Sequence, residues 1–257
     1  MTSPVFNATG AVLNAGGIVL GGIIGFARAG RPLSPQTQAF FKVALGVFAV
    51  FFGLRLVWLN VNGRFLQVLG QIGIALLALV LGRLLGRLLR LQRASNRLGQ
   101  HARQLIEKAK PTDPQRFSNG LNVCAILFCA APLGIVGAVV DGLAVTPDGA
   151  GYFYPLAVKA LMDGLAMLGF VVMFGPGAMA AALPVLVFQA TITLGCRFYL
   201  EPFLRAHDLL DSVNAAGGFM ICAIAPVIFG IRRVELADYL PCLVVAPVLT
   251  WVFRAVT

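Results

Sequence analysis

The chain has 257 residues, of which 59% are hydrophobic and only 12% are charged, and its mean hydropathy is +0.87. Soluble domains carry about 25% charged residues, so this composition excludes a soluble globular fold, and it equally excludes disorder. The net charge of +10 is concentrated in residues 83–116, which contribute +7 through nine Lys or Arg against two acids. Basic residues beside apolar segments follow the positive-inside bias, so this cluster predicts membrane topology and not nucleic-acid binding.

Apolar segments long enough to cross a bilayer run through most of the chain. A span needs about 20 mainly apolar residues, and eight segments meet that length. The first lacks the basic region of a cleavable signal peptide, so we expect it to remain as a membrane helix. The sequence therefore predicts an all-α polytopic bundle in one membrane domain, 1–257. Helices one to three fall in 10–89, four to six in 119–198 and seven and eight in 213–255; the spans are 10–27, 40–59, 65–89, 119–141, 154–174, 177–198, 213–231 and 237–255.

The polar segment 90–117 separates the third span from the fourth. Its apolar residues recur at helical spacing among basic ones, which predicts an amphipathic helix on the cytoplasmic surface. Anionic lipids are the expected partners from Arg90 to Lys110. If all eight segments cross, both termini lie outside, together with the loop that contains Asp148. The apolar positions are Leu91, Leu98, Leu105 and Ile106.

A weak internal similarity appears at an offset of 177 residues. It aligns 26–29 with 203–206 and 52–55 with 229–232, which relates helices one to three to helices six to eight. This odd displacement would invert the topology of the second copy, as in many transporters. Two alternatives are coincidence and a re-entrant fourth or fifth segment, which would make the repeats parallel.

The fifth span contains two charges one helical turn apart, Lys159 and Asp163. Ionisable residues at membrane depth are costly, so they pair, face a polar interior or mark a pathway. Asp141 ends the fourth span, and an antiparallel hairpin of the two spans would bring it toward Lys159. These three residues could form the core of a transport pathway that is coupled to protons or a monovalent cation. The alternative is that they are structural and form ion pairs that lock two helices together.

Further polar or helix-breaking residues lie in the neighbouring spans. Pro132, followed by two glycines, weakens the fourth helix in mid-membrane and frees carbonyl groups that could coordinate an ion. Together with the three charged residues, these positions predict an ion or small-solute site between helices four, five and six. The additional candidates are Asn122, Pro132, Gln189 and Thr191.

Glycines recur every fourth residue at Gly17, Gly21 and Gly25, and again at Gly82 and Gly86. Such ladders let helix backbones touch, either within the chain or between the subunits of a homo-oligomer. Enzyme signatures of the GxxxxGK[ST], HExxH and GxSxG types are missing, and the two histidines are far apart in sequence. We therefore expect no enzyme, cofactor or metal site, and we interpret the five cysteines as small buried hydrophobes.

Residues 128–143, FCAAPLGIVGAVVDGL, resemble the signature FCxGPMAILGAIxDGL of the YqgA-like family, a domain of unknown function (DUF 554). Residues 159–164 are similar to its KSxLDG, 188–190 to its YQG and 240–241 to its LPAL. Ala131, Ala160 and Ala190 replace a glycine, a serine and a glycine of these motifs, so no site that relies on that serine hydroxyl is expected. The resemblance implies a multi-pass protein of the bacterial inner membrane, loosely associated with biofilm formation, and names no substrate.

The sequence leaves three functional hypotheses. The leading hypothesis is a small transporter or channel for an ion or small polar solute. The alternative is a non-enzymatic membrane scaffold or regulator in which the buried charges are structural and the basic helix 90–117 recruits partners. An intramembrane enzyme built on the paired carboxylates is a third hypothesis.

Overall fold

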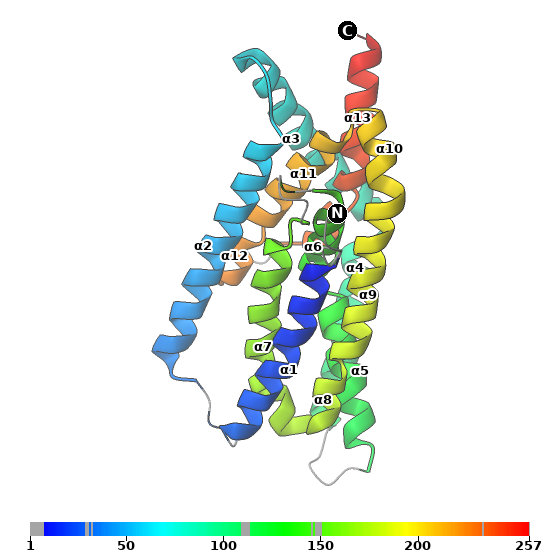
Figure 1. The fold of residues 1–257 in the computed structure, drawn as a ribbon. Coiled ribbons are helices and arrows are strands. Elements are labelled where there is room, and N and C mark those ends of the chain that lie inside the picture. Colours follow the sequence, from blue (N-terminus) through cyan, green and yellow to red (C-terminus); the bar gives the residue numbers. More distant parts are fainter. Residues whose placement is uncertain are drawn as a thin grey trace, which may run out of the picture.

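The computed structural model describes residues 8–28, 31, 33–108, 114–144, 146, 151–232 and 234–256; Lys110 and Asp148 lie outside these ranges. The described chain forms an all-α bundle (Figure 1). Seven helical segments are long and apolar enough to cross a membrane, and a bent pair raises the number to eight. The helices are α1 (Thr9–Ala27), α2 (Pro35–Leu59), α3 (Phe65–Leu88), α4 (Leu91–Lys108), α5 (Arg116–Cys129), α6 (Pro132–Leu143), α7 (Tyr154–Phe174), α8 (Pro176–Ala180), α9 (Ala182–Gly195), η1 (Cys196–Leu200), α10 (Glu201–Ala206), α11 (Leu210–Cys222), α12 (Ala225–Ile228), η2 (Leu236–Tyr239) and α13 (Cys242–Val256).

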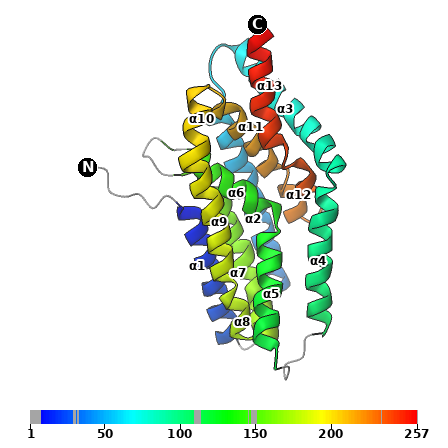
Figure 2. The same ribbon diagram turned by 90° about the vertical axis from the view of Figure 1, so that its right-hand side faces the viewer.

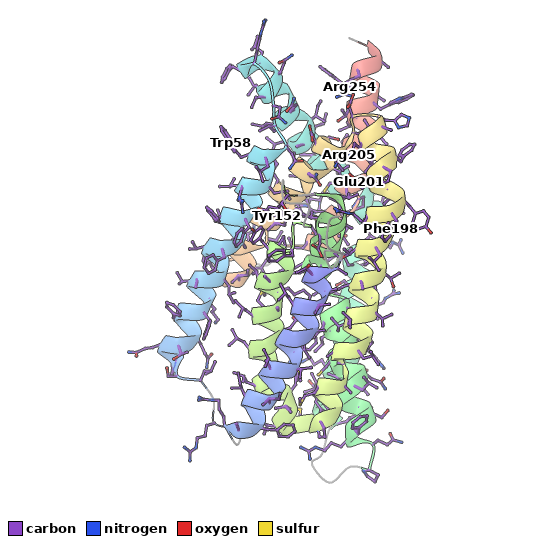
Figure 3. All side chains as sticks on the ribbon, viewed as in Figure 1. Trp58, Tyr152, Phe198, Glu201, Arg205 and Arg254 are labelled. Atoms are coloured by element: carbon purple, nitrogen blue, oxygen red, sulfur yellow. The ribbon has the colours of Figure 1, made fainter. Side chains whose placement is uncertain are left out.

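The outer surface of the bundle is apolar. Trp58 is 77% exposed and Phe198 is 59% exposed, and both side chains point away from the bundle (Figure 3). A soluble protein rarely exposes apolar patches over so many helices, so this surface fits a lipid environment. Tyr152, in contrast, lies inside and donates a 2.7 Å hydrogen bond to the carbonyl of Phe52.

The first glycine ladder packs against α7 within the same chain. A Cβ placed on Gly17 would lie 2.5 Å from the carbonyl oxygen of Ala160, and a Cβ on Gly21 would overlap the backbone of Gly164. The contacts advance in the same direction along both helices, so α1 and α7 run parallel with their backbones touching. Small residues permit this approach, which maximises dispersion contacts between the helices.

Each helix of the first triplet packs antiparallel against the helix that the 177-residue offset assigns to it. Asn14 of α1 contacts Gln189 of α9, and Gly53 of α2 faces Gly218 of α11. The second glycine ladder, on α3, faces η2 and the start of α13. Opposite directions within each pair are what an inverted repeat requires.

The fourth predicted span is interrupted. Ala131 has an extended backbone (φ −68°, ψ 121°) before Pro132, and α5 and α6 meet there at a 61° bend. At one end of the pair Gly120 lies against Phe174, the last residue of α7, and at the other end Asp141 lies against Gly151, just before α7 begins. The pair therefore follows the whole length of α7 as one broken crossing and does not turn back as a re-entrant loop.

The amphipathic segment forms α4, directly after α3. Arg90 adopts a left-handed conformation (φ 57°) between the two helices, and α4 then packs along α5 (Figure 2). Ala102 is its fully buried contact residue, while its three arginines are all exposed. The predicted amphipathic helix is thus present, and its small apolar face packs against the bundle.

We predict that Gly21→Ala disrupts the bundle whereas Gly16→Ala does not. The new Cβ at position 21 would overlap backbone atoms of α7, and overpacking typically costs about 1–3 kcal/mol. Gly16 lies on the same helix, and no atom lies within 4 Å of the position that an added methyl group would take there. Thermal unfolding of the purified proteins in detergent compares the two variants, and equal melting temperatures would contradict the backbone contact.

Candidate functional site

The buried pair of Lys159 and Asp163 lies at the centre of the bundle. The ammonium Nζ of Lys159 contacts carboxylate oxygen Oδ2 of Asp163, one turn further along α7. Lys159 is 2% exposed and Asp163 is 7% exposed. The ammonium also lies 5.6 Å from the centre of the Phe128 ring, on α5. Burial removes water from both charges, so each depends on the other and on nearby polar groups.

Two amides from other helices complete this cluster. Asn14 of α1 donates from Nδ2 to Oε1 of Gln189, on α9, at 3.1 Å. The Asn14 side chain also lies near the carboxylate of Asp163. Asn14 and Gln189 are both fully buried. The amides therefore link α1 and α9 to the ion pair on α7.

The break before α6 brings a third element to the same place. A Cβ on Gly134, the third residue of α6, would lie 2.8 Å from Cε of Lys159 and 3.1 Å from Nε2 of Gln189. The lysine stem occupies the space that a side chain at this position would need. The first turn of α6 thus adjoins the ammonium group. Because a helix begins with the positive end of its dipole, Asp163 offsets a locally positive environment.

Asp141 is not part of this cluster, so its expected proximity to Lys159 is wrong. Its Oδ2 accepts a 3.1 Å hydrogen bond from the backbone N–H of Gly10, in the first turn of α1. Arg197 is the cation that lies within electrostatic range of the Asp141 carboxylate. Leu156 packs against Gly137, between the levels of Asp141 and Lys159. Asp141 therefore caps α1, because an acid at a helix start satisfies free N–H groups and the dipole.

The structure does not bring Asn122 or Thr191 to the cluster either. Both are exposed on the outer surface, and Thr191 donates from Oγ1 to the carbonyl of Val187 in its own helix, at 2.7 Å. Pro132 acts indirectly, through the break that starts α6. Asn14 belongs to the cluster, although it was not among the site residues predicted from the sequence. Its sequence signal was an amide in an otherwise apolar helix.

The cluster is closed in this conformation. A cavity of about 720 Å³ lies between α2 and α7, where the two helices diverge (Figure 1). Its walls include Phe41, Met162 and Leu165, and they do not include Lys159, Asp163 or Gln189. Oδ1 of Asn14 and Nε2 of Gln189 are buried without a hydrogen-bond partner. The cluster thus combines enclosure with unused hydrogen-bonding capacity.

The side chains that most often bind metal ions are dispersed in the described part of the chain. Within these residues, no group of three His, Cys, Asp or Glu side chains is arranged to hold a metal ion. The five cysteines are free thiols. The polar groups that the cluster offers are one ammonium, one carboxylate and two amides.

Fold and site together define a polytopic α-helical membrane protein with a buried charged cluster. The chain belongs to the family described as a protein of unknown function (DUF554), which matches residues 9–251. It is 26% identical over 255 residues to the uncharacterized membrane protein YdfK of Bacillus subtilis (strain 168), covering 99% of this chain and 98% of that protein. It is 25% identical over 239 residues to the uncharacterized protein YqgA of Escherichia coli (strain K12), covering 92% and 94% respectively. No solved structure matches the chain.

We predict that the two charges of the ion pair are strongly coupled. Removing one partner of a buried pair leaves the other uncompensated and typically costs about 3–5 kcal/mol, whereas replacing both is often tolerated. Lys159→Met and Asp163→Asn should each lower the thermal stability more than the double variant does. Unfolding of the three variants in detergent measures this coupling. A double variant as unstable as the sum of the single variants would contradict it.

Proposed function

We propose that the protein is a small transporter whose substrate site is the cluster of Lys159, Asp163, Asn14 and Gln189. The observation that carries this proposal is a buried ion pair beside the start of a broken helix, with one amide atom on each of Asn14 and Gln189 that lacks a partner. Broken spans place helix ends at membrane depth, where they can bind a polar solute. The enclosed arrangement corresponds to an occluded state, which an alternating-access cycle would open to either side.

Proton coupling follows from the chemistry of the pair. Protonation of Asp163 would remove the negative charge that offsets Lys159 and the positive end of α6. The vacated ammonium and the N–H groups of the amides could then bind an oxygen-rich solute. We therefore favour a proton over a monovalent cation as the coupling species. The substrate that moves with it would be a small anion or a carbonyl-bearing polar solute.

The charge distribution supports a proposed location and proposed partners. We infer that α4 lies on the cytoplasmic side of a bacterial inner membrane, because its three arginines are all exposed and the helix follows directly after α3. Anionic lipid headgroups are the natural partners for such a helix. Assembly into a homo-oligomer would use the remaining apolar surface, since both glycine ladders are occupied within the chain.

The second candidate function is a non-enzymatic scaffold or regulator. It is favoured by the enclosure of the ion pair, since neither Lys159 nor Asp163 lines the cavity between α2 and α7. In that case the charges lock α7 to α1 and α9, and α4 provides the functional surface. The two candidates differ in what the folded double variant, Lys159→Met with Asp163→Asn, can still do.

Flux measurements in proteoliposomes test the transport proposal. The wild type should move at least one solute from a panel of small anions, cations and polar metabolites, at a rate that depends on an imposed pH gradient. The folded double variant should lose this flux by roughly tenfold or more, equivalent to about 1.4 kcal/mol of lost site binding. Thr191→Val is the matched control, because its side chain lies on the outer surface of α9.

Two results would reject transport through this cluster. One is a wild type that moves nothing across the panel while its unfolding profile is intact. The other is undiminished flux in the folded double variant. The scaffold function is supported if two results are found together. The double variant keeps the cellular phenotype of the wild type, and a variant in which the arginines of α4 are neutralised loses it.

A further inference from the structure

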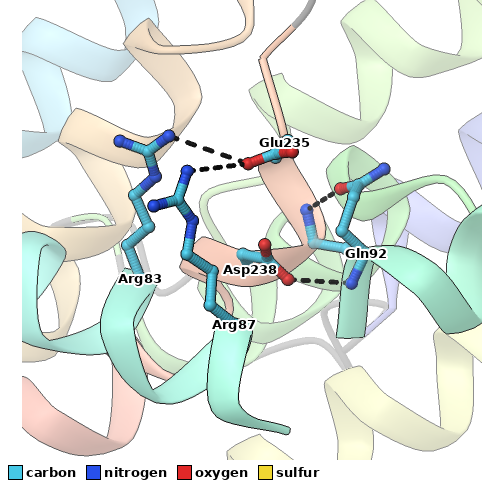
Figure 4. A network of polar contacts seen from close by, with 6 residues as sticks. Arg83, Arg87, Gln92, Glu235 and Asp238 are labelled. Carbon is cyan, nitrogen blue, oxygen red and sulfur yellow. Dashed lines mark hydrogen bonds and ion pairs between the residues drawn. The ribbon is translucent and has the colours of Figure 1, made fainter. Parts of the chain in front are cut away.

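A second polar site lies at the junction of α3 and α4. Its residues are distinct from those of the buried cluster. Its cavity has a volume of about 600 Å³, within the range of ordinary small-molecule sites. It is formed by the last turns of α3, the start of α4 and the segment that leads into η2 (Figure 4). The residues that line it are Arg83, Arg87, Gln92, Asn96, Arg232, Val234, Glu235 and Tyr239.

The lining carries an excess of positive charge. Oε2 of Glu235 accepts a 3.2 Å hydrogen bond from Nη2 of Arg87 and lies 3.7 Å from Nη2 of Arg83. Arg232 is a third cation in the lining. Three arginines against one glutamate leave a formal charge of +2 on the cavity wall. Glu235 therefore neutralises only part of the wall and occupies guanidinium donors that an incoming anion could use.

Hydrogen bonds hold the two sides of the cavity together. The backbone N–H of Gln92 donates to Oδ1 of Asp238 at 2.8 Å, and Oε1 of Gln92 accepts from the backbone N–H of Ala237 at 3.1 Å. The guanidinium of Arg83 also stacks 5.4 Å from the centre of the Tyr239 ring. These contacts fix the start of α4 against η2. A preorganised wall reduces the conformational entropy that a ligand must overcome on binding.

We propose that this cavity binds a phosphate-bearing anion. Arg87 and Arg232 donate to the phosphate oxygens, and Glu235 acts as the internal competitor that the phosphate displaces from Arg87. Arginine suits this role because its planar donors match phosphate oxygens in pairs. The anion would tie α3, α4 and the segment before η2 together. The proposal stands independently of transport through the Lys159 and Asp163 cluster.

Binding measurements on the full chain, purified in an uncharged detergent, test this site. The probes are sodium pyrophosphate and water-soluble dihexanoyl phosphatidylglycerol, with dihexanoyl phosphatidylcholine as the zwitterionic lipid control. We expect saturable binding of one or both anionic probes by isothermal titration calorimetry. Preference for the anionic lipid over pyrophosphate assigns the ligand to a membrane headgroup, and the reverse assigns it to a soluble phosphate compound.

Variants that remove a positive or a negative charge from the cavity wall make the test specific. Arg87→Gln and Arg232→Gln should each lower the affinity for the anionic probe about tenfold, as expected for the loss of one charge-assisted hydrogen bond. Glu235→Gln should tighten it, because the competing carboxylate is removed. Arg97→Gln is the matched control, since Arg97 is exposed on α4 and does not line the cavity.

Three results would overturn the proposal. The first is the absence of saturable binding of either anionic probe to the wild type. The second is a loss in Arg97→Gln equal to that in Arg87→Gln, which would indicate general charge attraction. The third is unchanged or weaker binding in Glu235→Gln while its thermal unfolding matches that of the wild type.

Discussion

The ammonium group of Lys159 is buried at the centre of the bundle, and its compensation constrains every helix around it. An ammonium removed from water is tolerated only with a counter-charge and hydrogen-bonding neighbours. Asp163 provides the charge from the same helix, while Asn14 and Gln189 provide amides from α1 and α9. These contacts require the helices to approach closely. The glycines of α1 and Gly134 of α6 make that approach possible, because a side chain at those positions would occupy the same space.

The broken crossing serves the same arrangement. A straight helix through residues 116–143 would carry no free end in mid-membrane. The extended residue before Pro132 ends one helix and begins another, so α6 starts beside the lysine stem. The acid at its far end, Asp141, then caps α1. One interruption thus sets both the polarity of the cluster and the starting point of the helix that supplies Asn14.

The two polar regions differ in their physical character. The Lys159 and Asp163 pair is enclosed and neutral overall, with amide atoms left unused. The arginine-lined cavity at the end of α3 is open and positively charged, with Glu235 half exposed at its centre. An enclosed neutral site suits a solute that is released from water during a conformational cycle. An open, positively charged site suits an anion that binds at the surface and fixes the elements around it.

Several errors of prediction have a common cause, which is the rotation of helices about their own axes. Asn122 and Thr191 were grouped with the interior because they lie at membrane depth, yet both point outward. In helices that are apolar nearly all round, the hydrophobic pattern does not indicate which face is inside. The level of Asp141 was misjudged for a related reason. The hairpin of α6 and α7 is offset, so that Gly134, and not Asp141, meets Lys159.

The sequence by itself determined the membrane class, the seven or eight candidate spans, the break at Pro132, the amphipathic α4 and the pairing of Lys159 with Asp163. Each of these depends on local composition or on residues one helical turn apart, which the backbone geometry brings together. Only the tertiary structure decided that Asn14 joins the ion pair, that Asp141 caps α1 and that three arginines line one cavity with Glu235. Those contacts connect residues more than a hundred positions apart, and they depend on how each helix is rotated and shifted against its neighbours.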